Sequence, residues 1–166
     1  MKVKKVLILI AAGFLFMWAP SLWAQVPPSF ETTPVITEVE ARRFVDEYVH
    51  EYVKMNLDAF MGFFSTKAIE NRMLTYGDIR DIYRMTFENS ESLAYDLKIW
   101  TVQIYREGAS VAGYYEIVQA LKGTPLKKVY KGNIQWDLIR EDGVLRIKEI
   151  NYGRDYRWDR PWHPYP

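Results

Sequence analysis

Residues 132–152 read GNIQWDLIREDGVLRIKEINY, and the alternation within this stretch decides the fold. Apolar side chains recur at every second position from Ile134 to Leu138 before Asp142-Gly143 and at Leu145 and Ile147 after it, which is the period of a β-strand. Asp-Gly suits the tight turns that join antiparallel strands. The stretch therefore predicts two antiparallel strands connected around Asp142-Gly143.

The same period extends upstream of this hairpin. It begins near Leu93, and further turn signals stand at Glu107-Gly108 and Gly123-Thr124-Pro125. Strands that follow one another with such short connections pair as neighbours in a meander. We therefore expect four long antiparallel strands between Leu93 and Tyr152.

Ahead of these strands the apolar period becomes helical, and three helix starts can be recognised. Thr37 and Glu40 form a T-x-x-E capping box, Asn56 or Asp58 can cap a second, short helix, and Thr75 with Asp78 begins a third. The predicted buried faces are Ala41, Phe44, Val45, Tyr48, Val49 and Tyr52 in the first helix, Phe60, Met61, Phe63 and Phe64 in the second, and Ile79, Ile82, Tyr83, Thr86 and Phe87 in the third.

The turns also fix which residues face each other, because a two-residue turn sets the register of a hairpin. With turns at Glu107-Gly108 and Gly123-Thr124, the apolar partners fall on one face of the sheet. Charged partners of opposite sign fall on the other face. The pairs so predicted include Trp100 with Tyr115, Tyr115 with Gly132 and Val111 with Trp136 on the apolar face, and Glu116 with Lys131 and Asp137 with Lys148 on the other.

This order of elements resembles the nuclear transport factor 2-like superfamily, of the SnoaL-like, cystatin-like kind. The resemblance covers Val39 to Tyr152 and includes KMNLDAFMGFFS at residues 54–65 together with the stretch at 132–152. It implies an α+β cone, in which three N-terminal helices pack in the concave face of a curved antiparallel meander sheet. Relatives range from isomerases, dehydratases and cyclases to adaptors without catalysis, so the fold does not select a function.

The N-terminus predicts export. Residues 1–24 combine three lysines, an apolar run from Val6 to Trp18 and a small residue, Ala24, before Gln25, which is the pattern of a cleaved signal peptide. We expect a bacterial periplasmic or secreted protein with no stable membrane span after cleavage. An extended leader then occupies residues 25–36, the domain 37–152, and a tail rich in aromatic residues and proline 153–166.

Composition excludes several classes of function. Without residues 1–24 the chain has 19 basic and 21 acidic residues, a formal charge of −2, which gives no basic excess for nucleic acid. There is no cysteine, and of the two histidines His50 falls on the charged face of the first helix and His163 in the tail. We therefore expect no metal and no cofactor.

The predicted concave face is rich in aromatic side chains that could line a ligand pocket, although most of them could equally be plain core. The pocket residues so predicted are Tyr48, Tyr52, Trp100, Tyr115, Trp136 and Asn151, with Tyr130 beside them.

A candidate catalytic base depends on the register of the last strand. Without irregularity, Glu149 and Asn151 point into the pocket, where burial would raise the pKa of the Glu149 carboxyl. A β-bulge near Lys148 would instead turn Ile150 and Tyr152 inward. Both alternatives stay open at the level of sequence.

Three functions fit these observations. The first is a non-catalytic exported domain that binds a small apolar molecule or an envelope protein. The second is a small lyase or isomerase with Glu149 as general base. The third is a structural adaptor that docks through the aromatic tail, and the outer face of the sheet could serve a homodimer in any of them.

Overall fold

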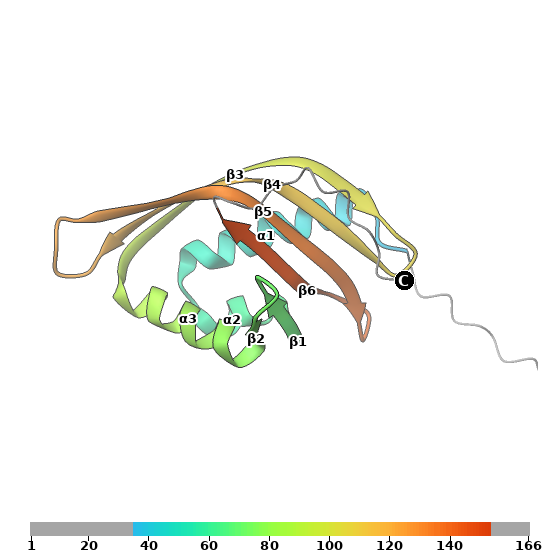
Figure 1. The fold of residues 1–166 in the computed structure, drawn as a ribbon, viewed down its shortest axis with the longest axis horizontal. Helices are drawn as coiled ribbons and strands as arrows, with labels where there is room; N and C mark the ends of the chain where they lie inside the picture. The colour runs from blue at the N-terminus through green and yellow to red at the C-terminus, as the bar shows by residue number, and fades with distance from the viewer. Residues whose placement is uncertain (1–34, 154–166) are drawn as a thin grey trace, which may run out of the picture. The chain divides into compact units, whose positions relative to one another are not determined.

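The computed structural model describes residues 35–153, in which helices lie along the concave side of a curved, unclosed six-stranded sheet (Figure 1). The strand order is β2-β1-β6-β5-β4-β3, antiparallel except between β1 and β6. This is the expected α+β cone. The elements are α1 (Glu38–Lys54), α2 (Leu57–Met61), β1 (Phe64–Glu70), β2 (Leu74–Thr75), α3 (Tyr76–Asn89), β3 (Ser90–Ile104), β4 (Gly108–Leu121), β5 (Lys127–Glu141) and β6 (Val144–Gly153).

The three predicted helix caps are present. The Thr37 hydroxyl accepts a hydrogen bond from the Glu40 amide at 3.2 Å, and the Asn56 side chain accepts one from the Ala59 amide at 3.3 Å. Thr75 forms the predicted capping box with Asp78 at the start of α3. Each cap satisfies an amide that would otherwise lack a partner in the first helical turn.

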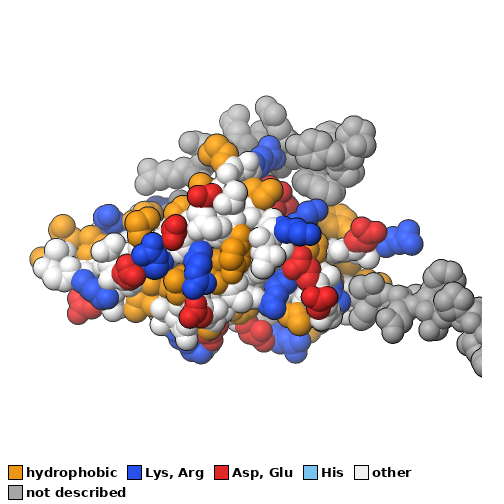
Figure 2. Space-filling model, turned by 90° about the horizontal axis from the view of Figure 1, so that it is seen from below, with side chains coloured by type: hydrophobic (Ala, Val, Ile, Leu, Met, Phe, Trp, Pro, Cys, Tyr) orange, Lys and Arg blue, Asp and Glu red, His pale blue; other side chains and the backbone are white. Residues whose placement is uncertain are grey.

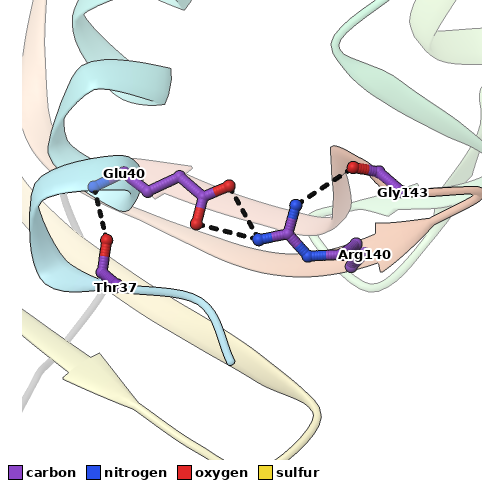
Figure 3. A network of polar contacts seen from close by, with 4 residues as sticks. All are labelled: Thr37, Glu40, Arg140 and Gly143. Atoms are coloured by element: carbon purple, nitrogen blue, oxygen red, sulfur yellow. Dashed lines mark hydrogen bonds and ion pairs between the residues drawn. The ribbon is translucent and has the colours of Figure 1, made fainter. Parts of the chain in front are cut away.

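The Glu40 carboxylate also links α1 to the last hairpin (Figure 3). It accepts two hydrogen bonds from Arg140 Nη2, at 2.7 and 2.8 Å, and Arg140 Nη1 donates to the Gly143 carbonyl at 3.0 Å. The pair is largely shielded from water, so it fixes where α1 begins against the end of β5.

The prediction for the second helix was wrong at its end. Helix α2 stops at Met61, and Phe64 begins β1 instead of extending the helix. The Gly62 amide closes the helix on the Ala59 and Asp58 carbonyls, after which the Phe63 carbonyl accepts from the Ile147 amide at 2.7 Å. The sequence did not predict β1 because its partner, β6, is more than 70 residues away and parallel to it.

The register of β4 against β5 is as predicted, with Val111 opposite Trp136, Tyr115 opposite Gly132 and Glu116 opposite Lys131. The Lys131 amine lies 3.9 Å from the Glu116 carboxylate. Gly123, at the tip of this hairpin, has a φ of 71°, which glycine adopts without strain.

The predicted register of β3 against β4 was wrong, because the chain turns before Gly108. Gly108 is already in the strand, where a Cβ would lie 2.5 Å from the Leu138 carbonyl oxygen of β5. This glycine allows close strand approach instead of a turn. A bulge between Ile99 and Thr101 then turns Trp100 away from the core, and Leu97 is the residue opposite Tyr115.

The last hairpin contains the bulge that the sequence left open. Leu138 pairs with Ile147, whereas Trp136 pairs with Ile150, so one extra residue enters β6 near Lys148. The predicted pair of Asp137 with Lys148 was therefore wrong, and Asp137 lies opposite Glu149.

Trp136 occupies the centre of the concave face, as predicted. It is 0% exposed, lies opposite Val111, and packs edge-on against Tyr48 of α1 with the ring centroids 5.7 Å apart. Among residues 35–153 no helix is long and apolar enough to cross a membrane. The predicted signal peptide, most of the leader and nearly all of the tail lie outside the described residues.

Candidate functional site

A cavity of about 230 Å³ lies between the helices and the concave face of the sheet. Seven of the twelve described residues that line it are tyrosines. A cavity of about 150 Å³ holds one benzene ring, and drug-sized ligands use about 300–1,000 Å³. The space therefore suits a compound of about two rings. The lining residues are Tyr48, Tyr52, Ile82, Tyr83, Thr86, Tyr95, Tyr115, Ile117, Gln119, Tyr130, Ile134 and Tyr152.

Simple periodicities bring the tyrosines together. Tyr48 and Tyr52 are four residues apart on α1 and so share one helix face, while Tyr115 and Ile117 alternate inward on β4. The rings meet edge to face, for example Tyr52 against Tyr95 with centroids 5.4 Å apart. Such contacts hold the aromatic wall in a defined geometry.

A buried carboxyl group stands behind one wall of the cavity. Glu70, at the end of β1, is 1% exposed, and its Oε1 accepts a hydrogen bond from the Tyr152 hydroxyl at 2.5 Å. Its Oε2 is also buried and has no hydrogen-bond partner in the part of the chain that the structure describes. Glu70 does not line the cavity, so it acts on a ligand through the phenols beside it, of which Tyr152 makes the short hydrogen bond.

Burial is the main influence on the ionisation of these groups. It raises the pKa of the Glu70 carboxyl, which hydrogen bonds from Tyr152 and Tyr83 lower in part. It also raises the pKa of the Tyr48, Tyr83 and Tyr152 hydroxyls. The tyrosines are therefore neutral near pH 7, and their hydroxyls can donate and accept hydrogen bonds.

A second polar position lies at Gln119. Its side-chain nitrogen donates to the Ser90 hydroxyl at 2.8 Å, and its oxygen accepts from the Tyr130 hydroxyl at 3.2 Å. These two contacts fix the orientation of the amide. The cavity thus combines an apolar middle, which includes Ile117 and Ile134, with polar groups at Gln119 and at Tyr152.

Three of the six predicted pocket residues, Tyr48, Tyr52 and Tyr115, line this cavity, as does Tyr130. Trp136 is not among the lining residues; it is fully buried and packs edge-on against Tyr48, which does line the cavity.

Two other predicted pocket residues lie on the outer face. Trp100 is 49% exposed and stacks on Tyr114 with centroids 6.3 Å apart, as a result of the bulge in β3. Asn151 is buried on the outer side of β6, where its amide donates to Glu149 Oε1 at 2.8 Å.

Glu149, the predicted candidate base, is also on the outer face, opposite Asp137. The bulge near Lys148 turns Ile150 and Tyr152 inward in place of Glu149 and Asn151. The carboxyl group close to the cavity is therefore Glu70 and not Glu149.

Sequence reasoning missed Glu70 because it missed the strand that carries it. The available signal was local: Glu70 has the same parity as Ala68 in FSTKAIE, so a strand that buries Ala68 also buries Glu70. Tyr83 was predicted on the buried face of the third helix, and Tyr152 was predicted to face inward only if the last strand contained a bulge. Neither was predicted to contact an acid.

The described residues also form open hollows whose walls are both polar and apolar. One, of about 470 Å³, lies beside the Glu40–Arg140 pair and is lined by Arg43, Glu47 and Arg146 among others. On the face seen in Figure 2, acidic and basic side chains are interspersed with apolar ones. No single sign of charge dominates that face, so it offers no obvious site for a highly charged partner.

No family model and no curated protein matches this sequence. Solved structures do match. A nuclear transport factor 2-like superfamily protein from Salmonella enterica has a TM-score of 0.61 and 12% identity, covering 75% of this chain and 96% of that one. Aln2 from a Streptomyces species has a TM-score of 0.59 and 18% identity, covering 74% and 95%. A ketosteroid isomerase-like protein from Erwinia carotovora has a TM-score of 0.57 and 14% identity, covering 74% and 100%.

The chain has the nuclear transport factor 2-like fold. At these identities the similar structures establish the fold and nothing about the ligand. Function has to be argued from the cavity itself.

Proposed function

We propose that the chain is an exported, non-catalytic nuclear transport factor 2-like domain that binds a small, mostly apolar ring compound in the tyrosine-lined cavity. The observation that carries the proposal is the cavity of about 230 Å³, walled by aromatic rings whose hydroxyls stay neutral. An apolar space with a few oriented polar groups is the usual form of a small-molecule site.

The expected affinity follows from the buried area. A two-ring hydrocarbon that buries roughly 200 Å² of apolar surface gains about 5 kcal/mol at ~25 cal/mol per Å². That free energy corresponds to a Kd somewhat below about 1 mM. Each hydrogen bond to a cavity hydroxyl can add about 0.5–1.5 kcal/mol.

Titration of the protein with indane, a two-ring hydrocarbon, tests the proposal by calorimetry. Ile117→Phe places a larger side chain in the cavity and should abolish binding. Val118→Phe is the matched control, because Val118 is the next residue of β4 and lies on the opposite face beside Val129. The proposal fails if the wild-type chain does not bind indane, or if both variants bind it equally well.

A small lyase or isomerase is the second candidate, and the buried Glu70 favours it. With Glu70 ionised, Tyr152 could accept a proton from a ligand carbon while it passes its own proton to Glu70. The test is exchange of the α-hydrogens of 1-indanone in heavy water, followed by NMR. Exchange that is accelerated by the wild-type chain and lost in Glu70→Gln would favour the enzyme over the binding protein.

Export is a separate part of the proposal and rests on residues 1–24 alone. The exported protein should begin at Gln25. Its intact mass, measured on the secreted or periplasmic fraction, checks this, and a mass that includes Met1 to Ala24 would indicate an uncleaved membrane anchor.

A further inference from the structure

The contact between Glu70 and Tyr152 joins an inaccessible acid to an accessible hydroxyl. Glu70 is 1% exposed, and one of its two oxygens has no partner among the described residues. The other accepts from Tyr152, whose side chain is part of the cavity wall. The Tyr152 backbone is also held, because its amide donates to the Asn71 side chain at 2.9 Å.

The hydroxyl of a tyrosine that lies between a carboxyl group and a cavity can direct its hydrogen to either side. When the acid is ionised it can only accept, so the phenol donates to it and offers its oxygen to the cavity. When the acid is protonated it can donate to the phenol, and the phenol hydrogen is then free to turn toward the cavity. The two arrangements suit opposite ligand groups.

We infer that Glu70, acting through the Tyr152 hydroxyl, sets whether the cavity receives a carbonyl or a hydroxyl group of its ligand. Protonated Glu70 makes Tyr152 a donor, which suits a ketone, and ionised Glu70 makes it an acceptor, which suits an alcohol. The inference deepens the proposed binding function and rests on it. It makes Tyr152 a specificity-determining residue and Glu70 a positioning residue.

The groups around Glu70 support the assignment of this role to Glu70. Within the described part of the chain, the titratable groups that influence it or are influenced by it are Tyr48 and Tyr52 on α1, Tyr83 on α3 and Tyr152 on β6. None of the ion pairs found among residues 35–153 includes Glu70. Since burial keeps these tyrosines neutral, Glu70 is the group of this cluster that changes charge below alkaline pH.

1-Indanone and 1-indanol are suitable probes, because they share one skeleton and neither ionises in water at moderate pH. Their Kd values would be measured with the full chain by calorimetry between about pH 5 and pH 9, a range in which a buried carboxyl can titrate. The ratio of the two affinities should shift toward the alcohol as the pH rises. One hydrogen bond gained or lost predicts a shift of about 2- to 10-fold.

Variants separate the inference from a general effect of pH. In Glu70→Gln and in Tyr152→Phe the ratio should be the same at every pH. Asp137→Asn is the matched control, since Asp137 is also an acid with a pKa raised by burial but lies on the outer face. This variant should keep the wild-type shift. Tyr152→Phe leaves the acid untouched and serves on its own if Glu70→Gln does not fold.

The outcomes are distinguishable. If the wild-type chain binds neither indane nor these two probes, the proposed binding function itself fails. If it binds them with a ratio that is constant in pH, or if the shift persists in Glu70→Gln or Tyr152→Phe, binding stands and the inference is overturned.

Discussion

The inner face of the sheet has a fully buried acid and the outer face a half-buried one, and their surroundings differ. Asp137 on the outer face accepts from the Gln135 amide at 2.8 Å and lies opposite Glu149. Glu70 on the inner face meets phenols, and one of its oxygens has no described partner. Burial raises the pKa of both carboxyls. The outer acid is bound by an amide of its own face, whereas the inner acid is bound by a phenol that lines the cavity and through which it can act on a ligand.

The largest expected difference between the faces is between two tryptophans. Trp136→Ala removes a fully buried ring from the inner face and should cost about 3–5 kcal/mol of unfolding free energy. Trp100→Ala removes a half-exposed ring stacked on Tyr114 and should cost about 1 kcal/mol. Urea unfolding of both variants measures the difference. Equal losses would mean that the two faces are packed alike.

Tyrosines provide the next comparison. Tyr152 packs against the core, so Tyr152→Ala should cost about 2–4 kcal/mol and should also leave Glu70 without its hydroxyl donor. Tyr114 on the outer face is 37% exposed, and Tyr114→Ala should cost about 1 kcal/mol. Thermal melts check both values. A small loss of stability in Tyr152→Ala would contradict the inward orientation of Tyr152 after the bulge.

The inner acid should make stability depend on pH in a defined direction. Because the pKa of Glu70 is higher in the folded chain than in the unfolded one, the folded chain binds more protons between the two values. The contribution of Glu70 to the free energy of unfolding is complete below about pH 4, the pKa of a glutamate in the unfolded chain. It is lost as the pH rises through the pKa of Glu70 in the folded chain. Glu70→Gln should therefore stabilise the chain near pH 7, relative to wild type, more than at about pH 4.

Urea unfolding at a series of pH values measures this difference. The change amounts to about 1.4 kcal/mol for each unit by which the pKa is raised. A Glu70→Gln variant whose stability tracks that of wild type at every pH would show that the carboxyl ionises normally and is not held neutral by its surroundings.

Some elements of this fold could be predicted from the sequence and others could not. The helix caps and the register of β4 against β5 were predictable, because short-range turn and capping chemistry determines them. The turn before Gly108 was not predictable. Gly108 allows the close approach of β5, and in the sequence a glycine with that role cannot be distinguished from a glycine in a turn. The inward tyrosines of α1 and α3 follow from helical periodicity, whereas the strand that carries Glu70 forms by parallel pairing with β6, which is distant in the sequence.

The smallest expected effect concerns Glu149 and tests the outer face alone. Glu149 accepts from the Asn151 amide and lies opposite Asp137, whose pKa it helps to raise. Glu149→Gln removes that repulsion but weakens the contact with Asn151, so the free energy of unfolding should change by no more than about 0.5 kcal/mol. The pKa of Asp137 should fall, because the negative charge opposite it is gone. NMR titration of the Asp137 carboxyl measures this fall, and indane binding should be unchanged. A loss of binding in Glu149→Gln would mean that the outer face takes part in the ligand site after all, and that the difference drawn between the two acids is wrong.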